Sequence, residues 1–197
     1  MASDSIERRL DRLESHKAMR ELATAYCVAA DDRDLEGLGR LFTDDVYIAS
    51  RDGGMDARGR ATVIAMFDRM FEIRGPSCHW THDMVVDFDD KDPDAARGMV
   101  IAHAETTPNG RPSVAAIRYY DTYRREAGSW RFAERILHFL YYMPIDEYLS
   151  RFPTALRIGV YGQSKAADFP ETLASWKGWL ERHGREIPAV HRPSGGA

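Results

Sequence analysis

The sequence has few cysteines and no long apolar run. Its 197 residues include only Cys27 and Cys78, which cannot form a disulfide framework and which fit a reducing compartment. The N-terminus, MASDSIERRLDR, lacks the apolar core of a secretion signal. No stretch approaches the roughly 18 apolar residues of a membrane helix. We therefore expect a cytoplasmic protein that does not enter the membrane.

Blocks of one charge and glycine-rich loops are also missing. The 31 acidic and 27 basic side chains are mixed along the chain, and no basic block suggests binding to nucleic acid. The pairs Gly53-Gly54 and Gly195-Gly196 are too short and misplaced for a phosphate or dinucleotide loop. The chain has no Gly-x-Ser-x-Gly nucleophile elbow. These absences argue against a nucleotide-binding protein and a serine hydrolase.

The first 42 residues show the spacing of amphipathic helices. Ile6, Leu10 and Leu13 lie at i, i+4 and i+7, and an apolar stripe continues from there to Tyr26. A short helix is expected over residues 35–42, with Asp34 as its N-cap. Another helix is expected over residues 63–71, and Gly75-Pro76-Ser77 ends it.

The later part of the chain changes to the alternation of strands. Strands are expected over residues 46–50, 84–88, 98–106, 113–125 and 130–143. Pro108 to Pro112 contains an Asn-Gly pair, which is a strong hairpin signal. Helices followed by an antiparallel sheet define the α+β class, with the helices covering one face of a curved sheet.

The pattern weakens after Met143. Two further helices are expected, within residues 145–152 and 170–184, and the last six residues read as a loose tail. We therefore divide the chain into a domain of residues 1–143 and a helical extension of residues 144–197. The aromatic residues of this extension favour a pocket lid over a contact between subunits.

Four histidines and one pair of acids could carry chemistry. Asp31 and Asp32 end an apolar helix stripe, where they either cap and solvate a turn or turn one carboxylate inward as part of a base. His103 and His138 alternate with apolar residues on their strands. Each alone is more often a hydrogen-bonded histidine of the inner sheet face than a catalyst. Several of them on one concave sheet would make a small-molecule pocket.

The spacing of His79-x-x-His82 is that of two ligands in a metal-binding site. On a strand, however, positions i and i+3 point to opposite faces, so the two rings should diverge. No cysteine pair and no His-Glu-x-x-His helix completes a ligand set. We therefore expect no metal. His82 has the parity of Met84 and should pack or support the site indirectly, unless a bulge intervenes.

Three segments of the sequence together resemble a known family. They read IERRLDRLESHKAMRELATAYCVAADDRDLEGLGRLFTDDVYI, GPSCHWTHDMVVDF and YYDTYRREAGSWRFAERILHF. They are similar to the SnoaL-like families of the nuclear-transport-factor-2-like superfamily, in the group that contains scytalone dehydratase, lindane dehydrochlorinase and bile-acid 7α-dehydratase. The resemblance spans roughly residues 6–142. It implies a cone-shaped, curved mixed sheet around a pocket, a barrel-like form covered by the N-terminal helices.

The resemblance also implies site residues. Dehydratase-like members pair an Asp at the end of the first helix with a His that opens the next strand, which places this pair at Asp31 and His79. His79 precedes Asp83 by the family's four positions, and Tyr26 matches a pocket tyrosine. The remaining expected substrate-binding residues are His138, His103, Glu105, Tyr47, Trp80 and Tyr119. The acid of the middle strand falls near Ala104 and the late-strand arginine near Phe139, so neither of these two residues is carried over.

The expected function is a lyase without metal or organic cofactor, most simply a dehydratase of a cyclic or polycyclic hydrophobic molecule. His79 would remove a proton and Asp31 would orient and stabilise its ring, as in other His–Asp pairs. Tyr26 or His138 would bind the developing oxyanion or protonate the leaving group. An isomerase and a non-catalytic binding protein or oxygenase subunit remain open. The family implies a homo-oligomer, either a dimer or a trimer.

Overall fold

The computed structural model describes residues 5–160, 162 and 164–185. The chain begins with α1 (Ile6–Asp31), whose N-terminus is capped by Ser5, because the Ser5 hydroxyl accepts a hydrogen bond from the backbone N–H of Arg8 at 3.2 Å. The second half of α1 buries Met19, Leu22 and Tyr26 against the sheet. The C-terminal end of α1 therefore lies at the interior of the molecule, where its last residue can face a pocket.

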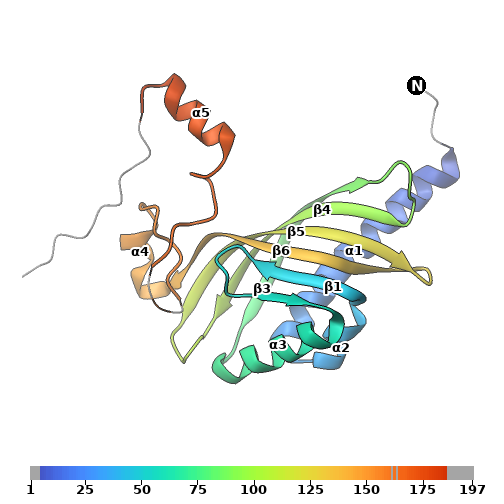
Figure 1. The fold of residues 1–197 in the computed structure, drawn as a ribbon, viewed down its shortest axis with the longest axis horizontal. Helices are drawn as coiled ribbons and strands as arrows, with labels where there is room; N and C mark the ends of the chain where they lie inside the picture. Colours follow the sequence, from blue (N-terminus) through green and yellow to red (C-terminus); the bar gives the residue numbers. More distant parts are fainter. Residues whose placement is uncertain (1–4, 161, 163, 186–197) are drawn as a thin grey trace, which may run out of the picture.

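The first turns of α1 differ from the expectation. Ile6, Leu10 and Leu13 are 80%, 52% and 70% exposed, although their spacing predicted a buried stripe. This end of the helix lies at the edge of the molecule (Figure 1) and makes polar contacts there. Asp11 pairs with Arg125 at 2.6 Å and Arg12 with Asp90 at 2.8 Å. The helical spacing therefore predicts the helix correctly, but it does not show how much of the helix is buried against the sheet.

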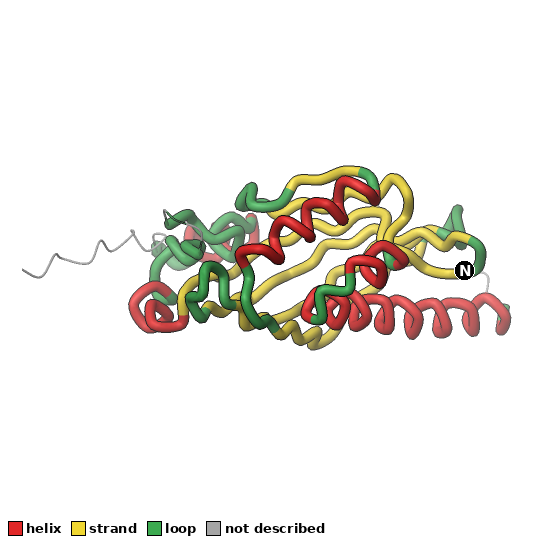
Figure 2. The backbone as a smooth tube through the Cα atoms, turned by 90° about the horizontal axis from the view of Figure 1, so that it is seen from below, coloured by secondary structure: helices red, strands yellow, loops and turns green. Residues whose placement is uncertain are grey.

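Two shorter helices follow on the same side of the sheet. The helix α2 (Leu35–Arg40) begins at Asp34, whose carboxylate accepts from the N–H of Gly37 at 2.7 Å, so the expected cap is confirmed. The helix α3 (Arg60–Ile73) packs Val63, Met66 and Phe67 inward. Figure 2 shows α1, α2 and α3 together on one side of the strands.

The sheet has six strands in the order β2-β1-β6-β5-β4-β3. These are β1 (Phe42–Ser50), β2 (Asp56–Arg58), β3 (Cys78–Phe88), β4 (Ala95–Thr106), β5 (Ser113–Glu126) and β6 (Ser129–Pro144). The pairs β3–β4, β4–β5 and β5–β6 are antiparallel, and β1 runs parallel to β6. The protein is therefore an α+β fold with a mixed, strongly curved sheet that does not close.

Register shifts bend the long strands. One shift lies between Thr81 and Met84 in β3, and another falls opposite the Ala116–Ile117 step of β5, where β6 has one extra residue. Such bulges increase local twist and change which side chains face inward. The turn between β4 and β5 carries Asn109 and Gly110, with φ of 51° and 74°, which agrees with the Asn-Gly turn expected from the sequence.

A buried ion pair lies in the core between the sheet and α1. Arg135 donates to Asp121 through Nε and Nη2, both at 2.8 Å, and Tyr123 donates to the same carboxylate at 2.8 Å. The guanidinium carbon lies 4.3 Å from the ring centres of Tyr26 and Tyr119. The positive charge is thus held by one carboxylate and by aromatic faces.

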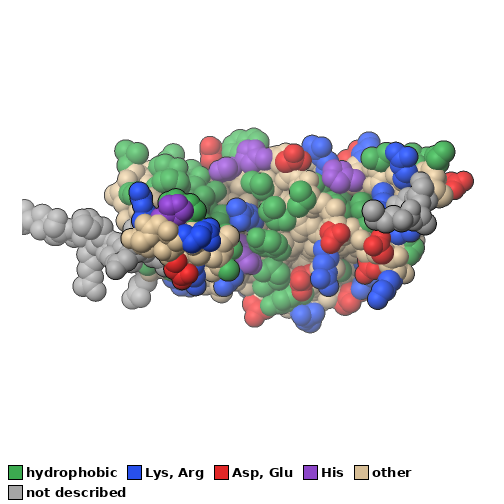
Figure 3. Space-filling view, turned by 90° about the horizontal axis from the view of Figure 1, so that it is seen from above, with side chains coloured by type: hydrophobic (Ala, Val, Ile, Leu, Met, Phe, Trp, Pro, Cys, Tyr) green, Lys and Arg blue, Asp and Glu red, His purple; other side chains and the backbone are tan. Residues whose placement is uncertain are grey.

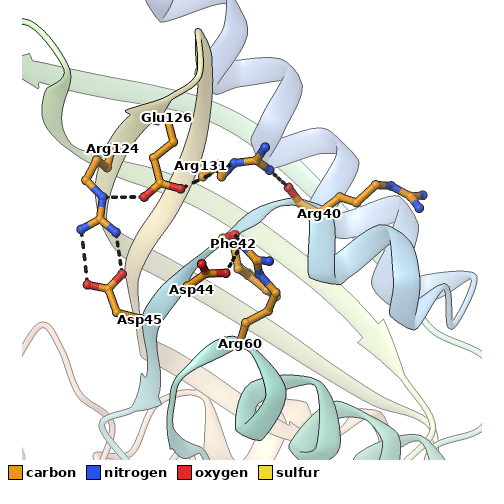
Figure 4. A network of polar contacts seen from close by, with 8 residues as sticks. All are labelled: Arg40, Phe42, Asp44, Asp45, Arg60, Arg124, Glu126 and Arg131. Carbon is orange, nitrogen blue, oxygen red and sulfur yellow. Dashed lines mark hydrogen bonds and ion pairs between the residues drawn. The ribbon is translucent and has the colours of Figure 1, made fainter.

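A second polar network joins β1 to its neighbours near the surface (Figure 4). Arg124 donates to Asp45 at 2.5 Å and to Glu126 at 2.9 Å, and Arg60 donates to the carbonyl of Phe42 at 2.8 Å. Exposed ion pairs of this kind contribute little stability singly. Their effect is to hold the start of α3 and the β5–β6 hairpin beside β1.

The extension after β6 packs along the C-terminal half of that strand. It contains the 3-10 turn η1 (Ile145–Glu147), α4 (Tyr148–Arg151) and α5 (Ala174–Arg182), with mainly irregular chain between α4 and α5. Because β1 pairs with β6 only as far as Leu137, the next part of β6 is free to bond elsewhere. Arg157 and Asp168 contribute backbone bonds to Tyr142 and Phe139, each at 2.9 Å. The expected loose tail lies outside the described residues.

Candidate active site

Asp31 and His79 meet where α1 ends and β3 begins. Oδ1 of Asp31 lies 2.7 Å from Nδ1 of His79, and Oδ2 accepts the backbone N–H of His79 at 2.8 Å. The hydroxyl of Ser77 donates to Oδ1 at 2.8 Å. The side chains of His79 and Asp31 are only 12% and 16% exposed. Asp31 therefore fixes both the ring and the backbone of His79.

The hydrogen bonds also set the charge of Asp31. Burial acts to raise its pKa, but the bonds and charge of His79, together with the Ser77 hydroxyl, outweigh burial and hold the pKa below its usual range. An ionised Asp31 can only accept a hydrogen bond, so Nδ1 of His79 carries the proton and donates to it. In the neutral ring this leaves Nε2 unprotonated, which is the form required of a general base.

His79 faces a narrow inner chamber of about 40 Å³. Its wall is mainly apolar and includes the small side chains of Ala104 and Ala115. A larger outer chamber of about 280 Å³ adjoins it and opens between α3, the β1–β2 loop and β6. Met55, Arg74, Phe139 and Tyr142 line both chambers. A small apolar molecule in the outer chamber can thus place one end beside His79.

Tyr26 and Tyr119 lie in the wall of the inner chamber. Burial raises the pKa of Tyr26 to about 12, against the opposing charge of Arg135, and burial also raises the pKa of Tyr119 well above its usual value. Both phenols therefore remain protonated near neutral pH. A protonated phenol can donate a hydrogen bond to an oxygen that gains negative charge.

Several residues expected in the pocket lie elsewhere. At the end of β4 the side chains of Ala102, Ala104 and Thr106 are buried, so His103 and Glu105 between them point outward. The ring of His138 packs 4.6 Å from Tyr120 on the outer face of the sheet, and Trp80 is half-exposed there. These four residues therefore line neither chamber, and their expected role in substrate binding stays a prediction.

Tyr47 also lines neither chamber. Its ring centre lies 4.3 Å from the guanidinium carbon of Arg58 on the neighbouring strand β2, away from both chambers. Of the six expected substrate-binding residues, Tyr119 alone lines the inner chamber.

The position of His82 agrees with the prediction only in part. It points away from His79, as strand geometry requires, but the register shift between Thr81 and Met84 also separates it from Met84. Nε2 of His82 lies 2.6 Å from Nδ1 of His103 on the outer face. The bulge therefore breaks the strand parity that His82 was expected to share with Met84.

Some site residues had no clear sequence signal. Ser77 stands two residues before His79 and so shares its strand parity, which could have found it. Arg74 follows α3, and Thr106 shares a 2.9 Å hydrogen bond with Tyr142 across the sheet. These positions depend on the tertiary fold. Within the described residues no three His, Cys, Asp or Glu side chains are grouped to hold a metal ion.

The comparisons with known proteins give the family. Residues 11–136 match the model of the SnoaL-like domain, so this chain belongs to the SnoaL-like domain family. No protein with a curated functional description matches its sequence. Along the described part of the chain, no helix combines the length and apolar character needed to cross a bilayer.

Solved structures share the fold at low identity. A hexachlorocyclohexane dehydrochlorinase, LinA type 2, superposes with a TM-score of 0.64 at 19% identity, over 70% of this chain and 93% of its own. A protein of Novosphingobium aromaticivorans provisionally described as a scytalone dehydratase gives 0.62 at 18% identity, over 68% and 89%. Another from that organism, provisionally described as an aromatic ring hydroxylase, gives 0.59 at 23%, over 70% and 92%.

Proposed function

We propose that this protein is a lyase that removes a proton from carbon and expels a leaving group from a cyclic hydrophobic molecule. The observation that carries the proposal is the 2.7 Å contact between Asp31 and His79 at the wall of an apolar chamber. The family relationship supports a small-molecule-converting enzyme. A dehydrochlorinase and a protein provisionally described as a dehydratase share this fold, and both descriptions name elimination reactions.

The proposed reaction uses three side chains. Nε2 of His79 takes the proton, the C–H electron pair forms the new double bond, and the leaving group departs with the electrons of its own bond. Asp31 stabilises the imidazolium that results. The phenol of Tyr26 donates a hydrogen bond to the developing oxyanion or the leaving oxygen. The departing hydroxyl takes up a proton from the imidazolium of His79, or from Tyr26, which His79 then reprotonates, so the products are an alkene and water and no cofactor is needed.

The product mass distinguishes this reaction from its nearest rival. The protein would be incubated with cyclic β-hydroxy ketones and the products followed by mass spectrometry. A dehydratase gives a product lighter by one water, whereas an isomerase that returns the proton to another carbon leaves the mass unchanged. Saturable binding without chemical change would instead identify a ligand-binding protein.

We also propose that copies of the chain associate through the outer face of the sheet. Trp80, Ile101 and Tyr120 are 46%, 42% and 38% exposed on β3, β4 and β5. Figure 3, which views the side opposite to Figure 2, shows apolar and histidine side chains lying close together on this face. Large apolar side chains grouped on a surface favour a protein interface.

A further inference from the structure

Ser77 lies at the end of a short loop that joins α3 to β3, two residues before His79. Two bonds hold this loop to the turn between β4 and β5. Gly75 donates to the carbonyl of Thr107 at 3.1 Å, and the hydroxyl of Thr107 donates to the carbonyl of Pro76 at 2.8 Å. A Cβ at Gly75 would lie 2.5 Å from Oγ1 of Thr107, so any side chain there would push Thr107 away. The sheet therefore fixes the backbone that carries Ser77.

The hydroxyl of Ser77 and the ring of His79 share one oxygen atom. Oδ1 of Asp31 accepts from Oγ of Ser77 at 2.8 Å and from Nδ1 of His79 at 2.7 Å. The other oxygen, Oδ2, accepts the backbone N–H of His79 at 2.8 Å. Ser77 is half-buried and the side chain of Asp31 is 16% exposed, so water competes little for these bonds. A carboxylate that is already stabilised by one donor has less to gain from a second.

Other titratable side chains surround the pair without bonding to the carboxylate. Four of them share the wall of the inner chamber with His79, namely Tyr26 of α1, Arg74 after α3, Tyr119 of β5 and Tyr142 of β6. The charge of Asp31 acts to raise the pKa of Cys27 and of Cys78, after the larger effect of desolvation. Glu105 of β4 points outward. Within the described residues, Ser77 is thus the one donor to Asp31 besides His79 itself.

We propose that Ser77 is a positioning residue that sets the basicity of His79 through the oxygen of Asp31 that both side chains share. Its hydroxyl limits how strongly Asp31 stabilises the protonated ring, while the bond from Oδ2 to the backbone keeps the ring in place. The ring then remains a free base at lower pH and gives up its proton more readily. The role in catalysis rests on the proposed function. The effect on the titration of the ring does not, because it requires no turnover.

The first test follows the titration of the His79 ring by NMR on the full chain with labelled histidine. The His79→Gln variant identifies its signal. Ser77→Ala should move the midpoint of this titration to higher pH by about half a pH unit or more, because Asp31 then bonds the protonated ring without a competitor. Ser150→Ala removes a hydroxyl bond on the exposed helix α4 and should keep the wild-type midpoint.

A pair of variants with matched shape isolates the hydroxyl. Threonine and valine at position 77 have nearly the same volume and differ in the hydroxyl group. Ser77→Thr should keep the wild-type midpoint, and Ser77→Val should show the shift of Ser77→Ala. Denaturant unfolding of each variant shows that the comparison is made on folded protein.

The second test is the pH profile of a base-catalysed reaction, the ring opening of 5-nitrobenzisoxazole. In Ser77→Ala the acid limb of the profile should move to higher pH together with the NMR midpoint. The rate on the plateau above it should stay within about twofold of the wild type. A merely structural role for Ser77 would lower the rate at every pH and leave the acid limb where it is, which would contradict the proposal.

Two results of the ring titration would also overturn the proposal. They are a midpoint in Ser77→Ala that is unchanged or lower, and a Ser77→Thr variant that behaves like Ser77→Val. The tests separate this inference from the proposed function. A shifted midpoint in a protein that does not accelerate the probe would contradict the proposed function and support the role of Ser77. An unshifted midpoint, in a protein whose activity is lost in His79→Ala, would do the reverse.

Discussion

The carboxylate of Asp31 accepts three hydrogen bonds. The stability of the fold should therefore depend on whether this carboxylate is ionised. Its pKa in the folded protein lies below the unfolded value of ~3.9, so its bonds stabilise the fold above that pH and lose this effect as the pH falls through the folded pKa. Asp31→Asn should lower the free energy of unfolding by about 1–3 kcal/mol at neutral pH.

The check on this prediction is denaturant unfolding at two pH values. The gap between wild type and Asp31→Asn should shrink in acid as the pH falls through the lowered folded pKa of Asp31, because the wild-type carboxyl then becomes protonated. A gap of the same size at both pH values would mean that the charge of Asp31 does not hold the pair together. Ser77→Ala serves as a milder control, since it removes one of the bonds that Asp31 accepts.

At the scale of elements, α1 offers a direct comparison between two leucines of one helix. Leu13 is exposed, whereas Leu22 is buried against the sheet. Leu22→Ala should lower the free energy of unfolding by about 2–5 kcal/mol, because it leaves a cavity. Leu13→Ala should change it by less than about 0.5 kcal/mol. Thermal or denaturant unfolding measures both, and a large cost at Leu13 would contradict the exposed position of the N-terminal turns.

Much of the element pattern could be predicted from the sequence, but the faces of the strands could not. The switch from helical to alternating spacing located the helices and most strands, although β1 starts at Phe42 and β3 at Cys78, earlier than expected. An alternating pattern shows that the two faces of a strand differ, but it does not show which of them points into the molecule. The structure places His103 and His138 on the outer face, which their alternation could not show, and the bulge in β3 separates His82 from Met84.

The pair of Asp31 and His79 was expected because a family resemblance linked two residues that lie 48 positions apart. No local pattern could make that link, since the contact depends on how α1 crosses the sheet. Arg74 shows the complementary case. It ends a helix with no special motif, and only the tertiary fold places it between two chambers.

At the scale of the whole molecule, the pair of Arg135 and Asp121 lies at the centre of the core. Both side chains are fully buried, and Asp121 raises the pKa of Arg135 against the effect of burial. Arg135→Met should destabilise the fold by about 3–5 kcal/mol, because it leaves a buried carboxylate without its partner. The double variant with Asp121→Asn should recover part of this loss. An unfolding curve unchanged by Arg135→Met would contradict the importance of the pair.

The association of subunits belongs to the same scale. Ile101→Arg places a charge in the middle of the exposed apolar face and should convert an oligomer into a monomer, as measured by light scattering after gel filtration. Val28→Arg, on the exposed side of α1, is the matched control and should leave the mass unchanged. A monomeric wild-type protein would contradict the proposed interface.

The measurement that tests the proposed chemistry most directly is the ring opening of 5-nitrobenzisoxazole, in which a base removes a proton from carbon and a phenolate is released. The reaction needs no knowledge of the natural substrate, and the bicyclic probe suits an apolar chamber. The wild-type protein should accelerate it above buffer, His79→Ala should lose about 10²–10⁴ of the rate, and His82→Ala should keep it. Equal rates for His79→Ala and the wild type would contradict His79 as the base.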